Sequence, residues 1–143
     1  MTTNTETGTL VDGEAHAFMV GVQRSITAAI AGLDLDALMD HFADDVRAYP
    51  NGAPAPLIGK EAVHGFYAEL FSQFDTAGAT AALEFDPNAH WEVIGELILD
   101  NGTSRLVTSY PGGTASQTVT DHVVWRRAGD RWQIIRYMER AAE

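Results

Sequence analysis

The spacing of the apolar residues changes once along this chain, and that change restricts the fold more than any other feature. Up to about Asp75, apolar residues recur every three or four positions, which is the spacing of one helix face. Beyond that point they alternate with a period of two, which is the spacing of a strand. Helices followed by a run of strands, without alternation between the two, predict an α+β fold.

Three helices are expected before the change. The first covers residues 15–33. The second, "DLDALMDHFADD", is expected to be capped by Asp34 and to bury Phe42 among its apolar side chains. A short strand over residues 46–49 and the loop "PNGAPAP" separate it from a third helix over residues 59–75.

Five strands are expected after the change, with short turns between them. They are "TAALEFD", "HWEVIG", "ELILDNGTSRLVTSY", "ASQTVTDHVVWRR" and "RWQIIRYME". Residues 91–99 and 119–125 are apolar on both faces of their strands, so the sheet needs cover on both sides. Helices would cover one side, and another subunit is one candidate for the other.

Length and composition bound the remaining choices. The 143 residues suit one domain, and residues 1–13, rich in Thr, Gly and acids, predict a mobile lead-in to a single domain over residues 14–143. There is no signal-peptide pattern and no run of membrane-spanning length, so a soluble cytoplasmic protein is expected. The net charge of −11 argues against nucleic acids and anionic membrane surfaces as partners.

The sequence contains no motif that would hold a metal or a cofactor. The absence of cysteine excludes disulfides and thiolate chemistry, and the five histidines are scattered, without metal-ligand spacing. There is no glycine-rich phosphate loop and no serine in a nucleophile elbow. We therefore expect neither a metal nor an organic cofactor.

Four segments together resemble a known superfamily. "AGLDLDALMDHFADDV", "IGKEAVHGFYAELF", "GELILDNGTSRLVTSYPGGT" and "VVWRRAGDRWQIIRYM" occur in the order and spacing of the nuclear-transport-factor-2-like superfamily, over residues 17–140. Within it the chain is most similar to the SnoaL-like and ketosteroid-isomerase-like proteins.

The resemblance implies a cone formed by a strongly curved mixed or antiparallel sheet, the cystatin-like α+β barrel. Three N-terminal helices would pack on its concave face around an apolar pocket, and two copies would form a homodimer through the outer face. The implied chemistry is proton transfer on small hydrophobic molecules, as in isomerases, dehydratases and polyketide cyclases, without metal or cofactor. The fold hosts many activities, so it does not define one.

The residues of ketosteroid isomerase carry over only in part. Its general base falls on Tyr49, or on Pro50 if the register slips by one, and its helix tyrosine falls on Ser25 or Ile26. Its protonated strand aspartate, aligned without gaps through "DRWQ", falls on His122. With two positions lost and the third changed, ketosteroid isomerisation itself is not expected.

The same alignment selects one face of the last two strands. Residues expected to face the pocket in this register are His122 and Val124, with Ile135, Tyr137 and Glu139. Strand residues alternate between faces, so Asp121 would then point outward. A shift of one residue would reverse this and turn Asp121 inward, where SnoaL-type cyclases carry an aspartate.

Two functions remain open on this interpretation. In the first, His122 is the acid/base group of an isomerase, lyase or cyclase, and Tyr49 helps to hold a substrate carbonyl, with Asp121 as the alternative catalytic residue. The expected substrate-binding wall consists of Phe66, Tyr67, Trp91, Val124, Ile135, Tyr137 and Glu139. In the second, the same pocket binds a hydrophobic ligand or supports an interaction without catalysis.

Overall fold

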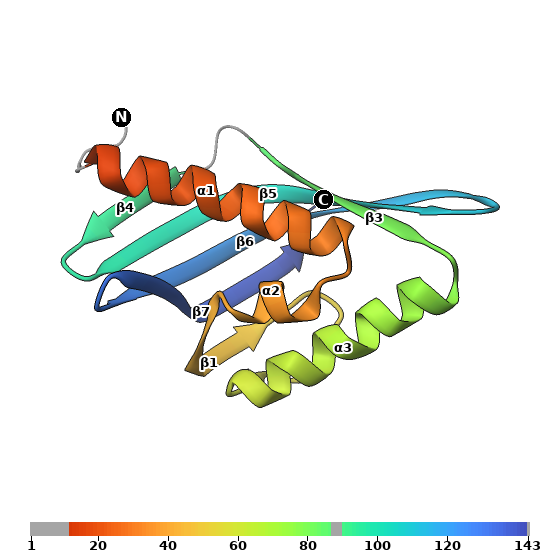
Figure 1. Ribbon diagram of the computed structural model, residues 1–143, viewed down its shortest axis with the longest axis horizontal. Coiled ribbons are helices and arrows are strands. Elements are labelled where there is room, and N and C mark those ends of the chain that lie inside the picture. The colour runs from red at the N-terminus through yellow and green to blue at the C-terminus, as the bar shows by residue number, and fades with distance from the viewer. Residues whose placement is uncertain (1–11, 87–89, 143) are drawn as a thin grey trace.

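The computed structural model describes residues 12–86 and 90–142, which form one curved sheet with three helices (Figure 1). The helices are α1 (Asp12–Ala31), α2 (Leu35–Met39) and α3 (Lys60–Thr76). The strands are β1 (Phe42–Tyr49), β2 (Leu57–Ile58), β3 (Thr80–Phe85), β4 (His90–Ile94), β5 (Leu97–Tyr110), β6 (Gly113–Ala128) and β7 (Arg131–Ala141). Of the lead-in expected over residues 1–13, the last two residues begin α1, and the others lie outside the described residues.

The sheet is mixed. Its strand order is β2-β1-β7-β6-β5-β3, and β4 pairs with β5 beside β3. The β1–β7 pair is parallel and the other pairs are antiparallel. Because β2 and β3 end the paired series, the sheet curls without closing, so the expected barrel is an open, curled sheet. The α+β class with three helices and a strongly curved sheet is confirmed.

The helices cover the concave face of this sheet (Figure 1). On α1, Phe18 packs edge-on against Trp125 of β6 with ring centroids 5.4 Å apart. On α3, Val63, Phe71 and Phe74 are buried. Full burial of each such side chain contributes about 1.5–3 kcal/mol, so both helices are held by packing rather than by helix propensity. Among the described residues, no helix is long and apolar enough to span a membrane.

The second helix is shorter than expected. The predicted cap is confirmed, since the Asp34 Oδ1 accepts a hydrogen bond from the Ala37 N–H at 3.1 Å. However, α2 ends at Met39, and Phe42 begins β1 instead of continuing the helix. The N–H of Ile134 in β7 donates to the carbonyl of His41 at 2.8 Å, which draws the chain into the sheet at that point. Pairing with β7 therefore overrides the helical spacing of this segment.

Candidate functional site

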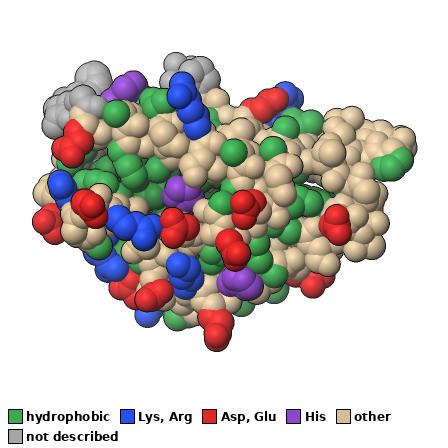
Figure 2. Space-filling view, viewed as in Figure 1, with side chains coloured by type: hydrophobic (Ala, Val, Ile, Leu, Met, Phe, Trp, Pro, Cys, Tyr) green, Lys and Arg blue, Asp and Glu red, His purple; other side chains and the backbone are tan. Residues whose placement is uncertain are grey.

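A cavity of about 220 Å³ lies between the helices and the concave face of the sheet. Its helical wall is apolar and includes Met19, Val22 and Ile26 of α1, with Phe66 and Leu70 of α3. In the space-filling view, hydrophobic side chains are visible in the recess between α1 and the elements below it (Figure 2). Polar groups also come from Gln23 of α1, Tyr67 of α3 and Asn51 after β1, but the carboxyl groups of the lining come from β5, β6 and β7 and are the candidates for chemistry.

An extra residue in β7 determines which side chains of the last two strands share the cavity. Next to the turn, Trp125 of β6 pairs with Ile134 of β7, but the preceding Val124 pairs with Arg136. Ile135 is therefore a β-bulge, and it reverses the faces of β7 beyond it. As a result, Asp121 lies directly opposite Glu139, and both line the cavity.

The expected inward orientation of His122 is wrong. Its side chain is exposed on the outer face, and its Nδ1 contacts the Oδ1 of Asn101. The physical reason is Trp125, which is only 1% exposed and faces the core. In a strand without a bulge, an inward residue 125 also turns residue 121 inward and residues 122 and 124 outward. Asp121 faces the pocket, as in the alternative register for β6, but Tyr137 and Glu139 of β7 also face it, because of the bulge at Ile135.

Other predicted residues divide between the cavity and its surroundings. Tyr67, Phe66, Tyr137 and Glu139 line the cavity, as expected. Four predicted residues are not part of its lining: Tyr49, Trp91, Val124 and Ile135.

The positions of these four residues explain why they do not line the cavity. Tyr49 is 38% exposed, near the end of β1. Trp91 packs against the core from β4, with its ring 5.5 Å from that of His16. Val124 lies on the outer face with His122, and Ile135 is the bulge residue.

Asp121 of β6 is one of the carboxyl groups that line the cavity. The Ser104 hydroxyl of β5 donates to its Oδ2 at 3.4 Å. Burial and, to a smaller extent, the nearby Glu139 charge raise the pKa of Asp121, the Ser104 hydrogen bond opposes them, and the pKa that results is about 6. Near neutral pH this carboxylate is therefore ionised but close to its titration point, as a general base requires.

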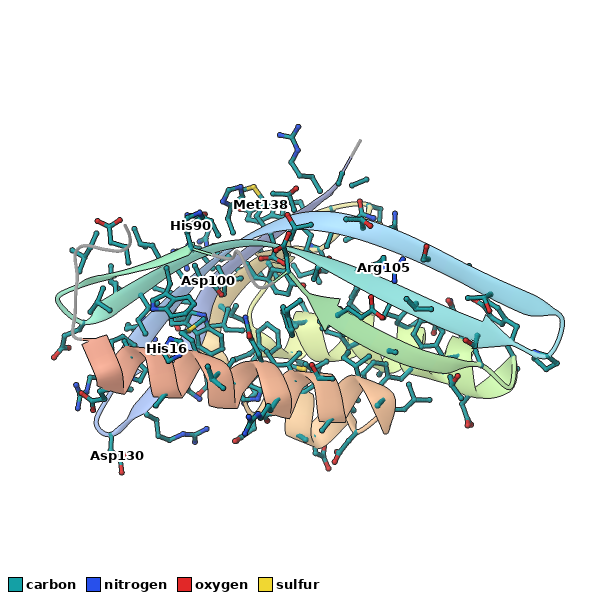
Figure 3. The ribbon with its side chains drawn as sticks, turned by 90° about the horizontal axis from the view of Figure 1, so that it is seen from above. His16, His90, Asp100, Arg105, Asp130 and Met138 are labelled. Atoms are coloured by element: carbon teal, nitrogen blue, oxygen red, sulfur yellow. The ribbon has the colours of Figure 1, made fainter. Side chains whose placement is uncertain are left out.

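Asp100 is a second carboxyl group of the cavity, and the sequence interpretation missed it. It comes from β5 and points from the sheet toward α1 (Figure 3). Burial and, to a smaller extent, the Asp121 charge raise its pKa, the indole of Trp125 opposes them, and the pKa that results is about 7. The Trp125 Nε1–H lies near this carboxyl but is not aligned for a regular hydrogen bond with any described residue. One feature of the sequence could have indicated it: Asp100 follows Ile98 by two positions, so the two side chains lie on the same face of the strand, and Ile98 is buried.

Two tyrosine hydroxyls and the carboxyl group of Glu139 form a second polar cluster in the cavity lining. The hydroxyls of Tyr67 and Tyr137 contact each other, and the Tyr137 hydroxyl donates to the Oε2 of Glu139. The backbone N–H of Asn51 donates to the other oxygen of Glu139 at 3.1 Å. Burial raises the pKa of both tyrosines well above the ordinary value, so the phenols stay neutral and serve as hydrogen-bond donors.

The cavity lining includes no Lys, Arg or His side chain among the residues that the structure describes. Nor do three His, Asp or Glu side chains of residues 12–86 and 90–142 converge as a metal site. The ionisable groups available at this wall are thus carboxyls and phenols, and the chemistry they can perform is proton transfer and hydrogen-bond donation to a bound molecule.

Solved structures of the same fold cover nearly the whole chain. Aln2 from a Streptomyces species is 15% identical, with a TM-score of 0.81 over 93% of this chain and 94% of that one. A candidate dehydratase of the NTF2-like family from Streptomyces avermitilis is 19% identical, with a TM-score of 0.74 over 91% and 99%. An NTF2-like protein with a cystatin-like fold from Novosphingobium aromaticivorans is 16% identical, with a TM-score of 0.69 over 96% and 93%. Identities this low show a shared fold and not a shared activity.

The sequence itself carries the family assignment. No curated protein sequence matches the chain significantly. The family model described as the SnoaL-like domain matches residues 22–135, which include α2, α3, the strands β1 to β6 and the first part of β7. The chain therefore belongs to the SnoaL-like domain family, and it shares the fold of the NTF2-like proteins.

Proposed function

We propose that this protein is a cofactor-independent enzyme of the isomerase, lyase or cyclase type, acting on an apolar carbonyl compound held in the cavity. The observation that carries the proposal is the pair Asp121 and Asp100, two carboxyl groups on neighbouring strands facing one apolar cavity. Their pKa values, raised to about 6 and about 7, make Asp121 the base and Asp100 the acid of the pair.

Asp121 acts first in this mechanism. Its ionised carboxylate removes a proton from the carbon next to the substrate carbonyl, and the C–H electron pair moves to form an enolate. The Ser104 hydroxyl, which donates to Asp121, holds the carboxylate in place for this step. Asp121 then returns the proton to another carbon in an isomerisation, or protonates a departing hydroxyl group in a dehydration.

Asp100 stabilises the charge that develops on the substrate oxygen. In its neutral form it donates an O–H to the enolate oxygen, which has a larger negative charge than the starting carbonyl. Because the interaction strengthens as the charge develops, it favours the transition state over the bound substrate. The apolar wall from α1 and α3 excludes water, which strengthens this hydrogen bond.

The proposal is tested with hydrogen exchange on a simple apolar ketone, 2-tetralone, in deuterated buffer. Mass spectrometry follows deuterium incorporation next to the carbonyl. The wild-type protein is expected to accelerate exchange, and Asp121→Asn to remove the acceleration while leaving the circular dichroism spectrum unchanged. Because His122 lies outside the cavity, His122→Gln serves as the matched control and should keep full exchange activity. Equal exchange by wild type and Asp121→Asn would refute Asp121 as the base.

A binding protein without catalysis is the second candidate function. The observation in its favour is the lining of the cavity, which is apolar over most of its wall. Under this alternative, native mass spectrometry would find a co-purified hydrophobic ligand, and neither wild type nor variants would accelerate exchange.

We further propose that two copies associate through the outer face of the sheet. Large apolar side chains remain exposed there, including Met138 at 46% and Ile94 at 50%. Figure 3 shows Met138 on the side of the sheet opposite α1. Large apolar side chains exposed on a sheet face are typical of an interface, and a second copy offers a matching face.

A further inference from the structure

Three acidic side chains form a row across the cavity wall, and no basic side chain of the described residues balances them there. Asp121 of β6 lies directly opposite Glu139 of β7, and Asp100 of β5 lies opposite Val123, two positions along the same face. Cross-strand neighbours of this kind lie within about 4.5–8 Å of each other. The polar side of the cavity is therefore negative, so a ligand that enters with its own negative charge would be repelled there. An enolate differs from such a ligand, because it forms only as Asp121 takes up the proton and loses its charge.

The same wall also offers hydrogen-bond donors. Trp125 is 1% exposed and lines the cavity, and its Nε1–H lies beside the Asp100 carboxyl without the alignment of a regular hydrogen bond. An indole N–H can only donate, and a buried donor with a poorly aligned acceptor forgoes part of a hydrogen bond. A ligand oxygen that reached the Trp125 and Asp100 side of the wall would supply that part.

We propose that the cavity selects uncharged carbonyl compounds, such as ketones and esters, and excludes the corresponding carboxylates. The donor on Trp125 favours an acceptor oxygen, and the carboxyl groups of Asp121 and Glu139 exclude an acceptor that carries a negative charge. This inference rests on the proposed function for the position of the substrate, and it adds the charge class of that substrate. Asp121 and Glu139 are then specificity determinants in addition to any catalytic role.

The test compares four naphthalenes of the same width, which differ only in the head group. They are methyl 2-naphthoate, 2-naphthoate, 2-(aminomethyl)naphthalene and 2-ethylnaphthalene, titrated by fluorescence at about pH 8, where a carboxylic acid is ionised and a primary amine is protonated. We expect the ester to bind at least tenfold more tightly than the carboxylate, and the amine to bind at least as tightly as the ester. Equal binding of ester and carboxylate would overturn the proposal. An amine as weak as the carboxylate would also overturn it, because the wall would then reject any charge.

Two sets of variants assign the selection to named residues. Asp121→Asn combined with Glu139→Gln removes negative charge without changing side-chain size, and should reduce the preference for ester over carboxylate by at least fivefold. Glu84→Gln is the matched control, because Glu84 pairs with Arg105 outside the cavity, and its preference should equal that of the wild type. An unchanged preference in the double variant would overturn the assignment to these carboxyl groups.

The donor on Trp125 is tested separately. Trp125→Phe keeps an aromatic ring but removes the N–H, so ester binding should weaken severalfold while 2-ethylnaphthalene binding is unchanged. Equal weakening for both ligands would indicate a packing defect and overturn the role of the N–H. All these measurements report binding alone. A failure of deuterium exchange with the binding order intact would therefore refute the proposed catalysis and not the selection by charge.

Discussion

Replacing the buried carboxyl Asp100 by the neutral amide in Asp100→Asn should stabilise the protein, and only above acidic pH. The pKa of Asp100 is raised from 3.8 to about 7, so between these values the carboxyl is ionised in the unfolded chain but protonated in the folded one. The wild type therefore loses stability as pH rises from about 4 to about 7 and reaches a constant level above that. The variant lacks this loss.

The change in the free energy of unfolding can be estimated from the pKa shift of Asp100. About three pKa units at 1.36 kcal/mol each give roughly 4 kcal/mol as an upper limit, because Asp100 keeps some exposure to the cavity. The buried amide also has hydrogen-bonding groups to satisfy, at a cost of about 1–2 kcal/mol. We therefore expect Asp100→Asn to raise the free energy of unfolding by about 2 kcal/mol near pH 8 and to leave it nearly unchanged near pH 4.5.

Urea denaturation followed by tryptophan fluorescence at both pH values measures this difference. Asp130→Asn is the control, because Asp130 is exposed in the turn between β6 and β7 (Figure 3) and should show no pH-dependent difference. If Asp100→Asn changes stability by the same amount at both pH values, the desolvation argument for Asp100 is refuted, together with its role as a neutral donor.

Four further variants test the fold and the assembly. His122→Gln should keep wild-type activity and stability, since this histidine is exposed on the outer face; loss of activity would contradict its assignment outside the site. Ile98→Ala should destabilise by about 2–5 kcal/mol in urea denaturation, because Ile98 is fully buried; a cost below about 1 kcal/mol would contradict its place in the core. Arg126→Ala should cost less than about 1 kcal/mol, since its ion pair with Asp45 is solvent-exposed; a larger loss would indicate a buried network. Met138→Glu should shift the sedimentation coefficient from dimer to monomer with folding intact, and a wild type that sediments as a monomer would refute the dimer.

The fold was predictable because its main determinants are local. The change from helical to alternating spacing separates α3 from β3, and Asp34 caps α2 as its sequence position predicts. The extent of α2 was not predictable in this way. Phe42 fits a helical face by spacing, and only the hydrogen bond between Ile134 and His41, from a strand more than ninety residues away, fixes it in β1.

The site was predictable only in part because it depends on register. Continuing the turn register between β6 and β7 without interruption pairs residue 122 with residue 137, so His122 and Tyr137 were expected to share a face. The bulge at Ile135 breaks that continuation, and a bulge of this kind has no clear signature in "WQIIRY". Asp100 was missed for a different reason. A single acid in a strand is usually a surface residue. Only the three-dimensional structure shows that Asp100 lies on the concave face of the sheet and is buried there.

The bulge also explains how one sheet satisfies two conflicting demands. Trp125 and Ile134 must face the core near the turn, whereas Tyr137 and Glu139 face the cavity farther along. In an unbroken strand, residues 134 and 137 would lie on opposite faces. The single extra residue removes the conflict, so the apolar core and the polar wall follow each other on the same concave surface. It is this local irregularity that sets Glu139 opposite Asp121 and gives the carboxyl row its continuity across three strands.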